Sequence, residues 1–186
     1  MGASSWPRPR GGDNLFFALL PDEPAQAKIQ AVVDDLAARG VFQRRPVPRH
    51  CWHITLLYIG RFDGVPADVV EAAGAVAARV GMKRLHICLD RLLSFDGRPG
   101  HHPLVLCPSR DSAPLRHLHV ALADHGRRLG LVRHSGSFAP HLTLGREPMH
   151  LLPEDVAPIC WRARDVVLVH SLVGQRHHVV LGRWGT

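Results

Sequence analysis

Two histidines, each followed two positions later by a threonine, are the residues of this chain best suited to catalysis. They occur as His53-Ile54-Thr55-Leu56 and again as His141-Leu142-Thr143-Leu144. Side chains alternate along a strand, so the His and Thr of each copy share one face and the apolar pair shares the other. The chain has only three Thr, and two of them follow a His in this way. We therefore interpret the two segments as a repeated motif, called the HxTx motifs below.

Two such motifs can support acid and base catalysis if they face each other across a cleft. One imidazole, when protonated, donates to a leaving oxygen, while the other, when neutral, takes a proton from water. The ordinary pKa of His, near 6.5, makes both forms accessible near neutral pH. The Thr hydroxyls can donate hydrogen bonds to the non-bridging oxygens of a bound phosphate. This combination suits hydrolysis of a phosphodiester without a metal ion.

Other kinds of catalytic site fit the sequence less well. There is no HExxH segment, and Thr is not a usual zinc ligand, so we expect neither a metal nor another cofactor. No GxSxG segment supports a serine nucleophile. The pairs His101-His102 and His177-His178 are interpreted as residues at loop edges.

Each motif is expected to follow the same series of elements: an apolar strand ended by Pro, a helix, and then the motif strand. The first series is a strand at 15–20, a helix capped by Asp22 and ended by Gly40, a basic loop at 43–49, and a motif strand at 51–59. The second is a strand at 103–107, a helix capped by Ser112 and ended by Gly130, and a motif strand at 139–146. The repeat predicts two related lobes.

The remaining segments complete an α+β fold. They are a helix from Pro66 to Gly81, a strand at 85–95, a turn at 96–100, a short turn or helix at 153–158, and a hairpin of 165–172 with 177–184. We expect two lobes related by an approximate twofold axis, each a small, mostly antiparallel sheet with helices outside, with the active-site cleft between them. Residues 15–186 form this single domain, and residues 1–14 are expected to be a flexible extension.

The composition of the chain indicates where the protein is located more than what it does. No apolar run is long enough to span a membrane, and the start lacks the layout of a signal peptide, so we expect a cytoplasmic protein. The net charge of +7 comes almost wholly from Arg, which fits either a solvated surface or attraction to a polyanion. The four Cys, at 51, 88, 107 and 160, are expected to be reduced, mostly buried thiols, without a disulfide or zinc site.

The two motifs, the opening LFFALLPDEP and the stretches HITLLYIGRF and FAPHLTLGRE resemble the 2H phosphoesterase family over about residues 14–184. They are most similar to its bacterial RNA 2′,3′-cyclic phosphodiesterases, also called 2′-5′ RNA ligases. The resemblance implies metal-independent hydrolysis of a terminal 2′,3′-cyclic phosphate on RNA to a 2′-phosphate. It implies that His53 is the proton donor and His141 the proton acceptor, and that Thr55, Thr143 and Arg146 bind the phosphate.

Alternatives to this hypothesis stay open. The same chemistry could act on 2′-5′-linked oligonucleotides, or on a small cyclic phosphate derived from ADP-ribose. Ligation of 2′-5′ ends is the reverse of hydrolysis. A catalytically silent module that binds nucleotides or RNA is a third possibility, which the intact His and Thr of both motifs disfavour. We expect the partners to be RNA 3′ ends or nucleotide cyclic phosphates, and the protein to be a monomer.

Overall fold

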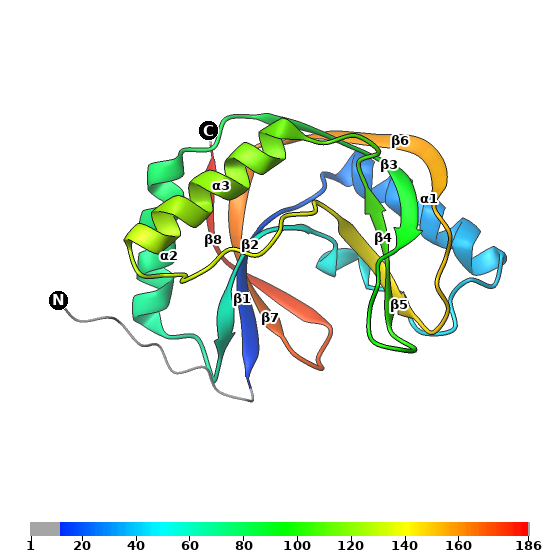
Figure 1. The fold of residues 1–186 in the computed structure, drawn as a ribbon, viewed down its shortest axis with the longest axis horizontal. Helices are drawn as coiled ribbons and strands as arrows, with labels where there is room; N and C mark the ends of the chain where they lie inside the picture. Colours follow the sequence, from blue (N-terminus) through cyan, green and yellow to red (C-terminus); the bar gives the residue numbers. More distant parts are fainter. Residues whose placement is uncertain (1–11, 186) are drawn as a thin grey trace.

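A computed structural model describes residues 12–185, which form three helices and one eight-stranded sheet (Figure 1). The strands are β1 (Asp13–Leu19), β2 (Ile54–Phe62), β3 (Leu85–Ser94), β4 (His102–Cys107), β5 (Leu142–Glu147), β6 (Glu154–Ala163), β7 (Asp165–Leu172) and β8 (His177–Gly185). The helices are α1 (Glu23–Ala38), α2 (Ala67–Val80) and α3 (Ala113–Arg128), and a short 3₁₀ turn spans Arg49–Cys51. Most of the extension expected at 1–14 lies outside the described residues, but Asp13 and Asn14 already belong to β1.

The order of the strands confirms the α+β fold, with one continuous sheet in place of the two small sheets expected. From one edge to the other the order is β6-β3-β4-β5-β2-β1-β7-β8, and every pair of neighbours is antiparallel. The two motif strands, β5 and β2, therefore meet at the centre. Each is flanked on its outer side by the strand that precedes its helix, β4 or β1. Two four-stranded halves thus repeat the same strand–helix–strand unit about the middle of the sheet.

The helices exchange sides between the halves. α1 links β1 to β2 but packs against β6 of the opposite half, whereas α3 links β4 to β5 but packs against β2 and α2. Figure 1 shows α1 beside β3, β4 and β6, and α2 with α3 over the half that contains β8. Two side-chain hydrogen bonds stabilise this arrangement. Trp161 Nε1 donates to Leu20 O at 3.1 Å, and His119 Nδ1 donates to Leu56 O at 2.7 Å. The exchange fixes the two halves relative to each other.

Local sequence accounts for most helix ends. The Asp22 carboxylate accepts a hydrogen bond from Ala25 N at 3.0 Å, so Asp22 caps α1 as predicted. Gly40 and Gly81 follow α1 and α2 with φ of 68° and 56°, where glycine is favoured. Ser112 occupies the N-cap position of α3, as predicted, but its side chain makes no capping hydrogen bond. α3 begins with a proline in its first turn, which has no amide hydrogen to be capped.

Two sequence-based expectations are wrong at the edge of the sheet. Residues 153–158, predicted as a turn or short helix, mostly belong to strand β6, which pairs with β3. Their side chains are largely exposed, because β6 is an edge strand, so the apolar alternation is visible only from Ile159 onward. Cys88 and Cys160 form a disulfide across β3 and β6, contrary to the expectation of four free thiols. Cys51 and Cys107 are free and buried, as expected.

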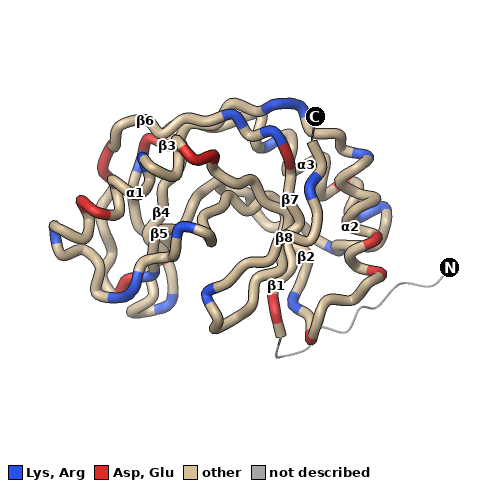
Figure 2. The backbone as a smooth tube through the Cα atoms, turned by 180° about the vertical axis from the view of Figure 1, so that it is seen from behind, with Lys and Arg blue, Asp and Glu red and all other residues tan. Residues whose placement is uncertain are grey.

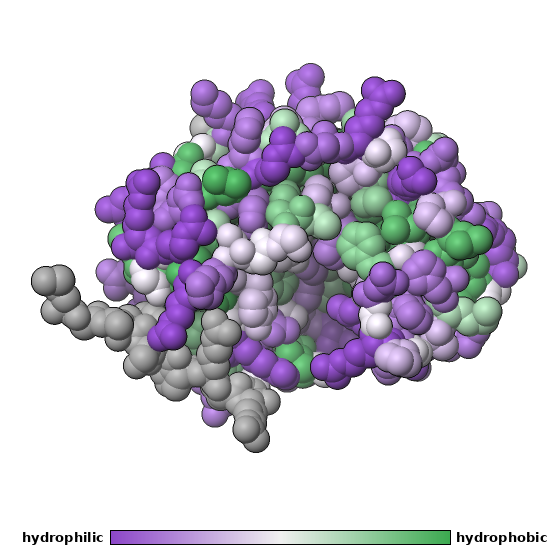
Figure 3. Space-filling model, in the orientation of Figure 1, coloured by the Kyte–Doolittle hydropathy of each residue, from purple (hydrophilic) through white to green (hydrophobic). Residues whose placement is uncertain are grey.

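The core lies between the sheet and the helices that cover it. Phe17, Leu19, Ile54, Leu56 and Leu142 are buried there together with the inner faces of the helices. Figure 3 shows a hollow between the two halves, with hydrophilic side chains along its lower rim and more apolar ones above it. No helix among residues 12–185 is long and apolar enough to cross a membrane.

Candidate active site

The two HxTx motifs line one cavity of about 520 Å³ at the junction of the halves. All five residues proposed from the sequence lie in its wall: His53, Thr55, His141, Thr143 and Arg146. The rest of the wall is Arg44, Arg45, Val47, Pro48 and Cys51 between α1 and β2, His101 in the β3–β4 turn, Gly145 on β5, Arg176 in the β7–β8 turn and His178 on β8. Segments far apart in the sequence therefore converge on the motif strands.

The pairing of β2 with β5 explains why the motifs come together. Ile54 and Leu142, the second residue of each motif, are Cα partners in this antiparallel pair. Both side chains are buried in the core, so the residues on either side of them point to the cavity. His53, Thr55, His141 and Thr143 therefore lie together in the wall of one cavity, with each imidazole next to the hydroxyl of its own motif.

Both imidazoles are held in the same way by their own strands. His53 Nδ1 lies 2.7 Å from Cys51 O, and His141 Nδ1 lies 2.7 Å from Ala139 O. A carbonyl oxygen can only accept, so Nδ1 carries the proton in both rings. The Nε2 atom of each ring is then the one that can exchange a proton with a ligand.

His53 is enclosed by other rings. It stacks on Phe16 with 4.8 Å between ring centroids and meets His178 edge-on at 5.0 Å, while its Nε2 lies 3.1 Å from Thr55 Oγ1. Burial lowers the pKa of His53 to about 4, against the opposing effect of the Cys51 carbonyl. The nearby charges that His178 and His141 would carry lower the pKa of His53 further. His53 is therefore neutral at pH 7 when no anion is bound.

His141 has a more open environment. Its ring meets Phe95 edge-on at 4.9 Å. Burial again lowers its pKa, the Ala139 carbonyl opposes this shift, and the positive charge of Arg146 adds to it. Both catalytic candidates thus favour the neutral form, and an anion in the cavity would raise the pKa of each.

The cavity wall is strongly basic. It carries four arginines and, among the described residues that line it, no Asp or Glu. Figure 2 shows Lys and Arg positions on both sides of the opening between the halves. Arg176 has a positive φ of 52° and donates to the carbonyl oxygens of Arg45 and Pro46, which ties the β7–β8 turn to the basic loop. This set of charges favours a phosphate ligand over a cation.

Several residues of the wall were missed by the sequence argument. Arg44 and Arg45 belong to the basic loop 43–49, whose charge was the available signal, and Arg44 donates to His101 Nδ1 at 2.7 Å. One member of each His pair lines the cavity, namely His101 and His178, although both pairs were interpreted as loop-edge residues. His101 and His178 face the cavity and His102 and His177 do not because of the strand register, which a sequence does not reveal.

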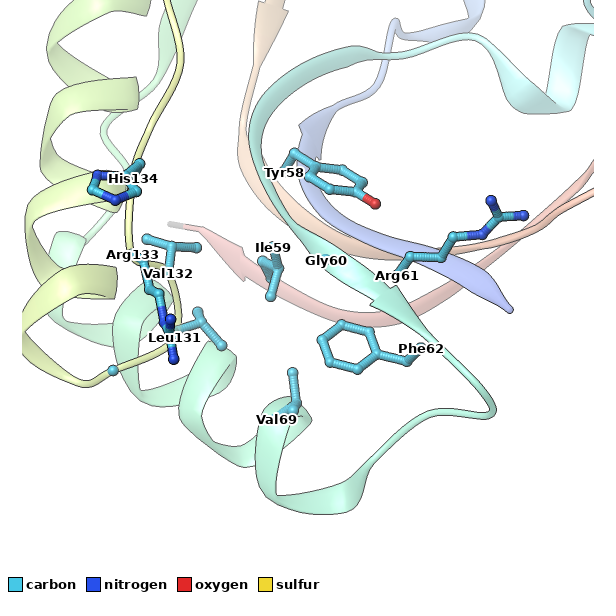
Figure 4. A pocket seen from close by; sticks show the side chains of 11 residues that line it. Tyr58, Ile59, Gly60, Arg61, Phe62, Val69, Leu131, Val132, Arg133 and His134 are labelled. Carbon is cyan, nitrogen blue, oxygen red and sulfur yellow. The ribbon is translucent and has the colours of Figure 1, made fainter. Parts of the chain in front are cut away.

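A second hollow, of about 440 Å³, lies between the far end of β2 and residues 130–134 (Figure 4). Figure 4 shows Tyr58 and Arg61 on the other side of β2 from Ile59 and Phe62. Tyr58 is half exposed, and its hydroxyl donates to Asn14 Oδ1 at 3.1 Å. None of these residues lines the cavity of the HxTx motifs.

Comparison with solved structures shows the same fold. LigT of E. coli in its apo form has a TM-score of 0.72 at 21% identity, covering 93% of this chain and 96% of that chain. LigT complexed with 3′-AMP has a TM-score of 0.76 at 21% identity, covering 94% and 98%. TT0787 of Thermus thermophilus has a TM-score of 0.72 at 23% identity, covering 92% and 97%.

Comparison with curated proteins finds no match. A family model does match, and it covers residues 20–174, from the end of β1 to the β7–β8 turn. That range includes both HxTx motifs and every residue of the cavity wall except Arg176 and His178. The chain therefore belongs to the 2′-5′ RNA ligase superfamily, the 2H phosphoesterases.

Proposed function

We propose that this protein hydrolyses the 2′,3′-cyclic phosphate at the end of an RNA to a 2′-phosphomonoester. The observation that carries the proposal is the common orientation of His53 and His141, whose Nδ1 atoms are both engaged by carbonyls in the wall of one cavity. Such a pair leaves two Nε2 atoms for two proton transfers at one phosphate. Membership of the 2H phosphoesterases supports phosphodiester chemistry in this cavity.

In the proposed reaction, water attacks phosphorus and gives a proton to Nε2 of neutral His141. The bond between phosphorus and the 3′ oxygen breaks, and Nε2–H of protonated His53 delivers a proton to that oxygen. The product keeps its phosphate on the 2′ oxygen, and solvent restores the two histidines to their starting forms. Thr55, Thr143 and Arg146 bind the non-bridging oxygens, where negative charge increases in the transition state.

Substrate binding supplies the protonated form of His53 that the proposed reaction requires. The pKa of His53 is about 4 because of burial, so the free protein holds it neutral at pH 7. A phosphate anion against its Nε2 favours the imidazolium, since an opposite charge at close range raises the pKa of a histidine. The proton donor is thus formed together with the enzyme–substrate complex.

The donors of the cavity support a reaction without a metal ion. Four guanidinium groups and two hydroxyls can neutralise and orient a phosphate, which is the task a divalent ion would otherwise have. Ligands typical of a hard cation are carboxylates, and the described wall contributes none. The positive charges would also repel a cation from the phosphate site.

The same site is suited to ligation, in which an alcohol replaces water as the nucleophile. If the 5′-hydroxyl of a second RNA takes the place of water, the same bond to the 3′ oxygen breaks and a 2′-5′ linkage forms. The name of the matched family favours this second activity. Solved LigT structures contain 3′-AMP, ATP or NADP+, which supports a nucleotide as the ligand here.

Product analysis tests the proposal. An RNA ending in a 2′,3′-cyclic phosphate is incubated with the protein in chelator, with and without a second RNA bearing a 5′-hydroxyl, and the phosphorus species are followed by ³¹P NMR. We expect conversion of the cyclic phosphate to a 2′-phosphomonoester, and conversion slower by about 10² or more with His53→Ala/His141→Ala. A 3′-phosphate product, or no turnover of the cyclic phosphate, would refute the proposal.

A further inference from the structure

A second cluster of reactive side chains lies on β3 and β6, outside the cavity of the HxTx motifs. Cys88 and Cys160 are Cα partners in the antiparallel pair, with their Cα atoms 4.1 Å apart. This short spacing is typical of a pair without hydrogen bonds between its own backbone groups, whose side chains lie closest together on one face. The two residues are 72 positions apart in the sequence.

His86 completes the cluster. It precedes Cys88 by two positions on β3, so the two side chains share a face. Its ring nitrogens lie 3.9 and 4.0 Å from Cys88 Sγ, and one ligand atom from each of the three residues falls within 4.8 Å of the others. The His86 side chain is exposed and both sulfurs are partly buried, so the cluster is open to solvent on one side.

We propose that Cys88, Cys160 and His86 form a binding site for a thiophilic d¹⁰ cation such as Zn²⁺ when the disulfide is reduced. Two thiolates and one imidazole are a common set of zinc ligands, and a water molecule completes the tetrahedron. In such a site neighbouring ligand atoms are about 3.3 to 3.8 Å apart, given metal–ligand bonds of about 2.0 to 2.3 Å. To reach this spacing the two sulfurs must separate, which reduction permits, and the exposed His86 ring must turn and move closer to them from its present 3.9 Å or more.

The site is controlled by the redox state of the two sulfurs. Two electrons and two protons convert the disulfide to two thiols, and a water-soluble phosphine can supply the electrons while it becomes the phosphine oxide. Zn²⁺ then displaces both thiol protons as it binds the thiolates. In the oxidised protein the sulfurs are bonded to each other and only His86 remains as a strong ligand.

The two strands that carry the cluster lie at one edge of the sheet. β6 is the edge strand of the sheet, held to it through β3. Either the disulfide or the bound ion joins these two strands, so the ion can replace the bond as a link in the reduced protein.

The test uses the full chain, reduced with a phosphine that does not bind zinc, and a chromophoric chelator as competitor. The parent for these measurements is Cys51→Ala/Cys107→Ala, which removes the two other thiols and leaves the proposed site intact. We expect this reduced parent to bind one Zn²⁺ and to release about two protons per ion in unbuffered solution. Co²⁺ in place of Zn²⁺ should give the absorption of thiolate-to-metal charge transfer.

Variants at the site separate it from adventitious binding by the other histidines. Addition of Cys88→Ser or Cys160→Ser should weaken Zn²⁺ binding at least 100-fold, and His86→Ala should weaken it about 10-fold or more. The oxidised protein should bind no more Zn²⁺ than the Cys88→Ser/Cys160→Ser variant. Equal Zn²⁺ affinity in the reduced parent and in Cys88→Ser/Cys160→Ser, or an absence of thiolate absorption with Co²⁺, would overturn the proposal.

Discussion

His53 and His141 direct the same ring atom, Nδ1, at the carbonyl oxygen of the residue two positions earlier, and both distances are 2.7 Å. The two catalytic candidates are therefore equivalent in orientation and tautomer, although β2 and β5 lie in different halves of the sheet. They differ in surroundings. His53 is stacked on Phe16 and next to His178, whereas His141 is next to Phe95 and Arg146. Symmetric placement with unequal environments is the arrangement expected of an acid and a base.

Removal of either imidazole tests the need for both. His53→Ala and His141→Ala should each lower kcat by about 10² or more with little change in binding, because proton transfer contributes only in the transition state. The double variant should be scarcely slower than either single variant, since the two groups act as a unit. His117→Ala, an exposed substitution on α3, is the matched control. Steady-state kinetics with a cyclic phosphate substrate measure all four, and additive losses would contradict the coupled mechanism.

The pH dependence follows from the lowered pKa values. The productive form has one histidine protonated and one neutral, and in the free protein burial shifts both pKa values below 6.5, that of His53 to about 4. At pH 7 both are then neutral, so kcat/KM should rise as pH falls from 7 toward the pKa values. It should fall again once the second histidine is protonated.

The profile of kcat should differ from that of kcat/KM. A bound phosphate anion raises both histidine pKa values, so the optimum of kcat should lie at a higher pH than the optimum of kcat/KM. Rate profiles between about pH 4 and 8 provide the test. Coincident optima would mean that substrate does not supply the protonated donor.

The hydroxyls of Thr55 and Thr143 should contribute less to the rate of the reaction than the two imidazoles. Thr55→Val and Thr143→Val keep the shape of the side chain and remove one donor to the phosphate. Each should weaken transition-state binding by about 1 to 3 kcal/mol, the range for a hydrogen bond to a charged group. The ratio of kcat/KM values gives this quantity directly. A loss as large as that of the histidine variants would assign the hydroxyls a part in proton transfer.

Activity should survive removal of metal ions. The wall of the cavity offers guanidinium and hydroxyl groups to the phosphate, so excess chelator should leave kcat unchanged within about a factor of two. Turnover before and after dialysis against chelator checks this. Loss of activity that a divalent ion restores would contradict the metal-independent mechanism.

The central part of the site could be predicted because it depends on local spacing. Alternation along a strand is enough to set His53 beside Thr55, and the repeat of the motif implies that two such strands face one cavity. The outer wall depends on contacts between distant segments. Arg44 meets His101 across 57 positions, and the backbone of Arg176 accepts a hydrogen bond from His50 across 126.

The same limit explains the two errors at the edge of the sheet. The link between Cys88 and Cys160 depends on the register of β3 with β6, which no local pattern reveals. The first part of β6 was predicted as a turn or helix because only one side of an edge strand needs apolar residues, and Pro158 lies within it. The exchange of α1 and α3 between the halves also depends on tertiary packing alone.

The division of labour between the two histidines is tested most directly with a leaving group that needs no proton. A nitrophenyl phosphodiester expels a stable anion, so loss of the proton donor should matter little for it, whereas loss of the base should still slow attack by water. We predict that the nitrophenyl ester restores turnover in His53→Ala to within about tenfold of the unmodified protein and leaves His141→Ala slow. Restoration of His141→Ala alone would show that the two roles are reversed. Restoration of neither would contradict proton transfer to the leaving group by either histidine.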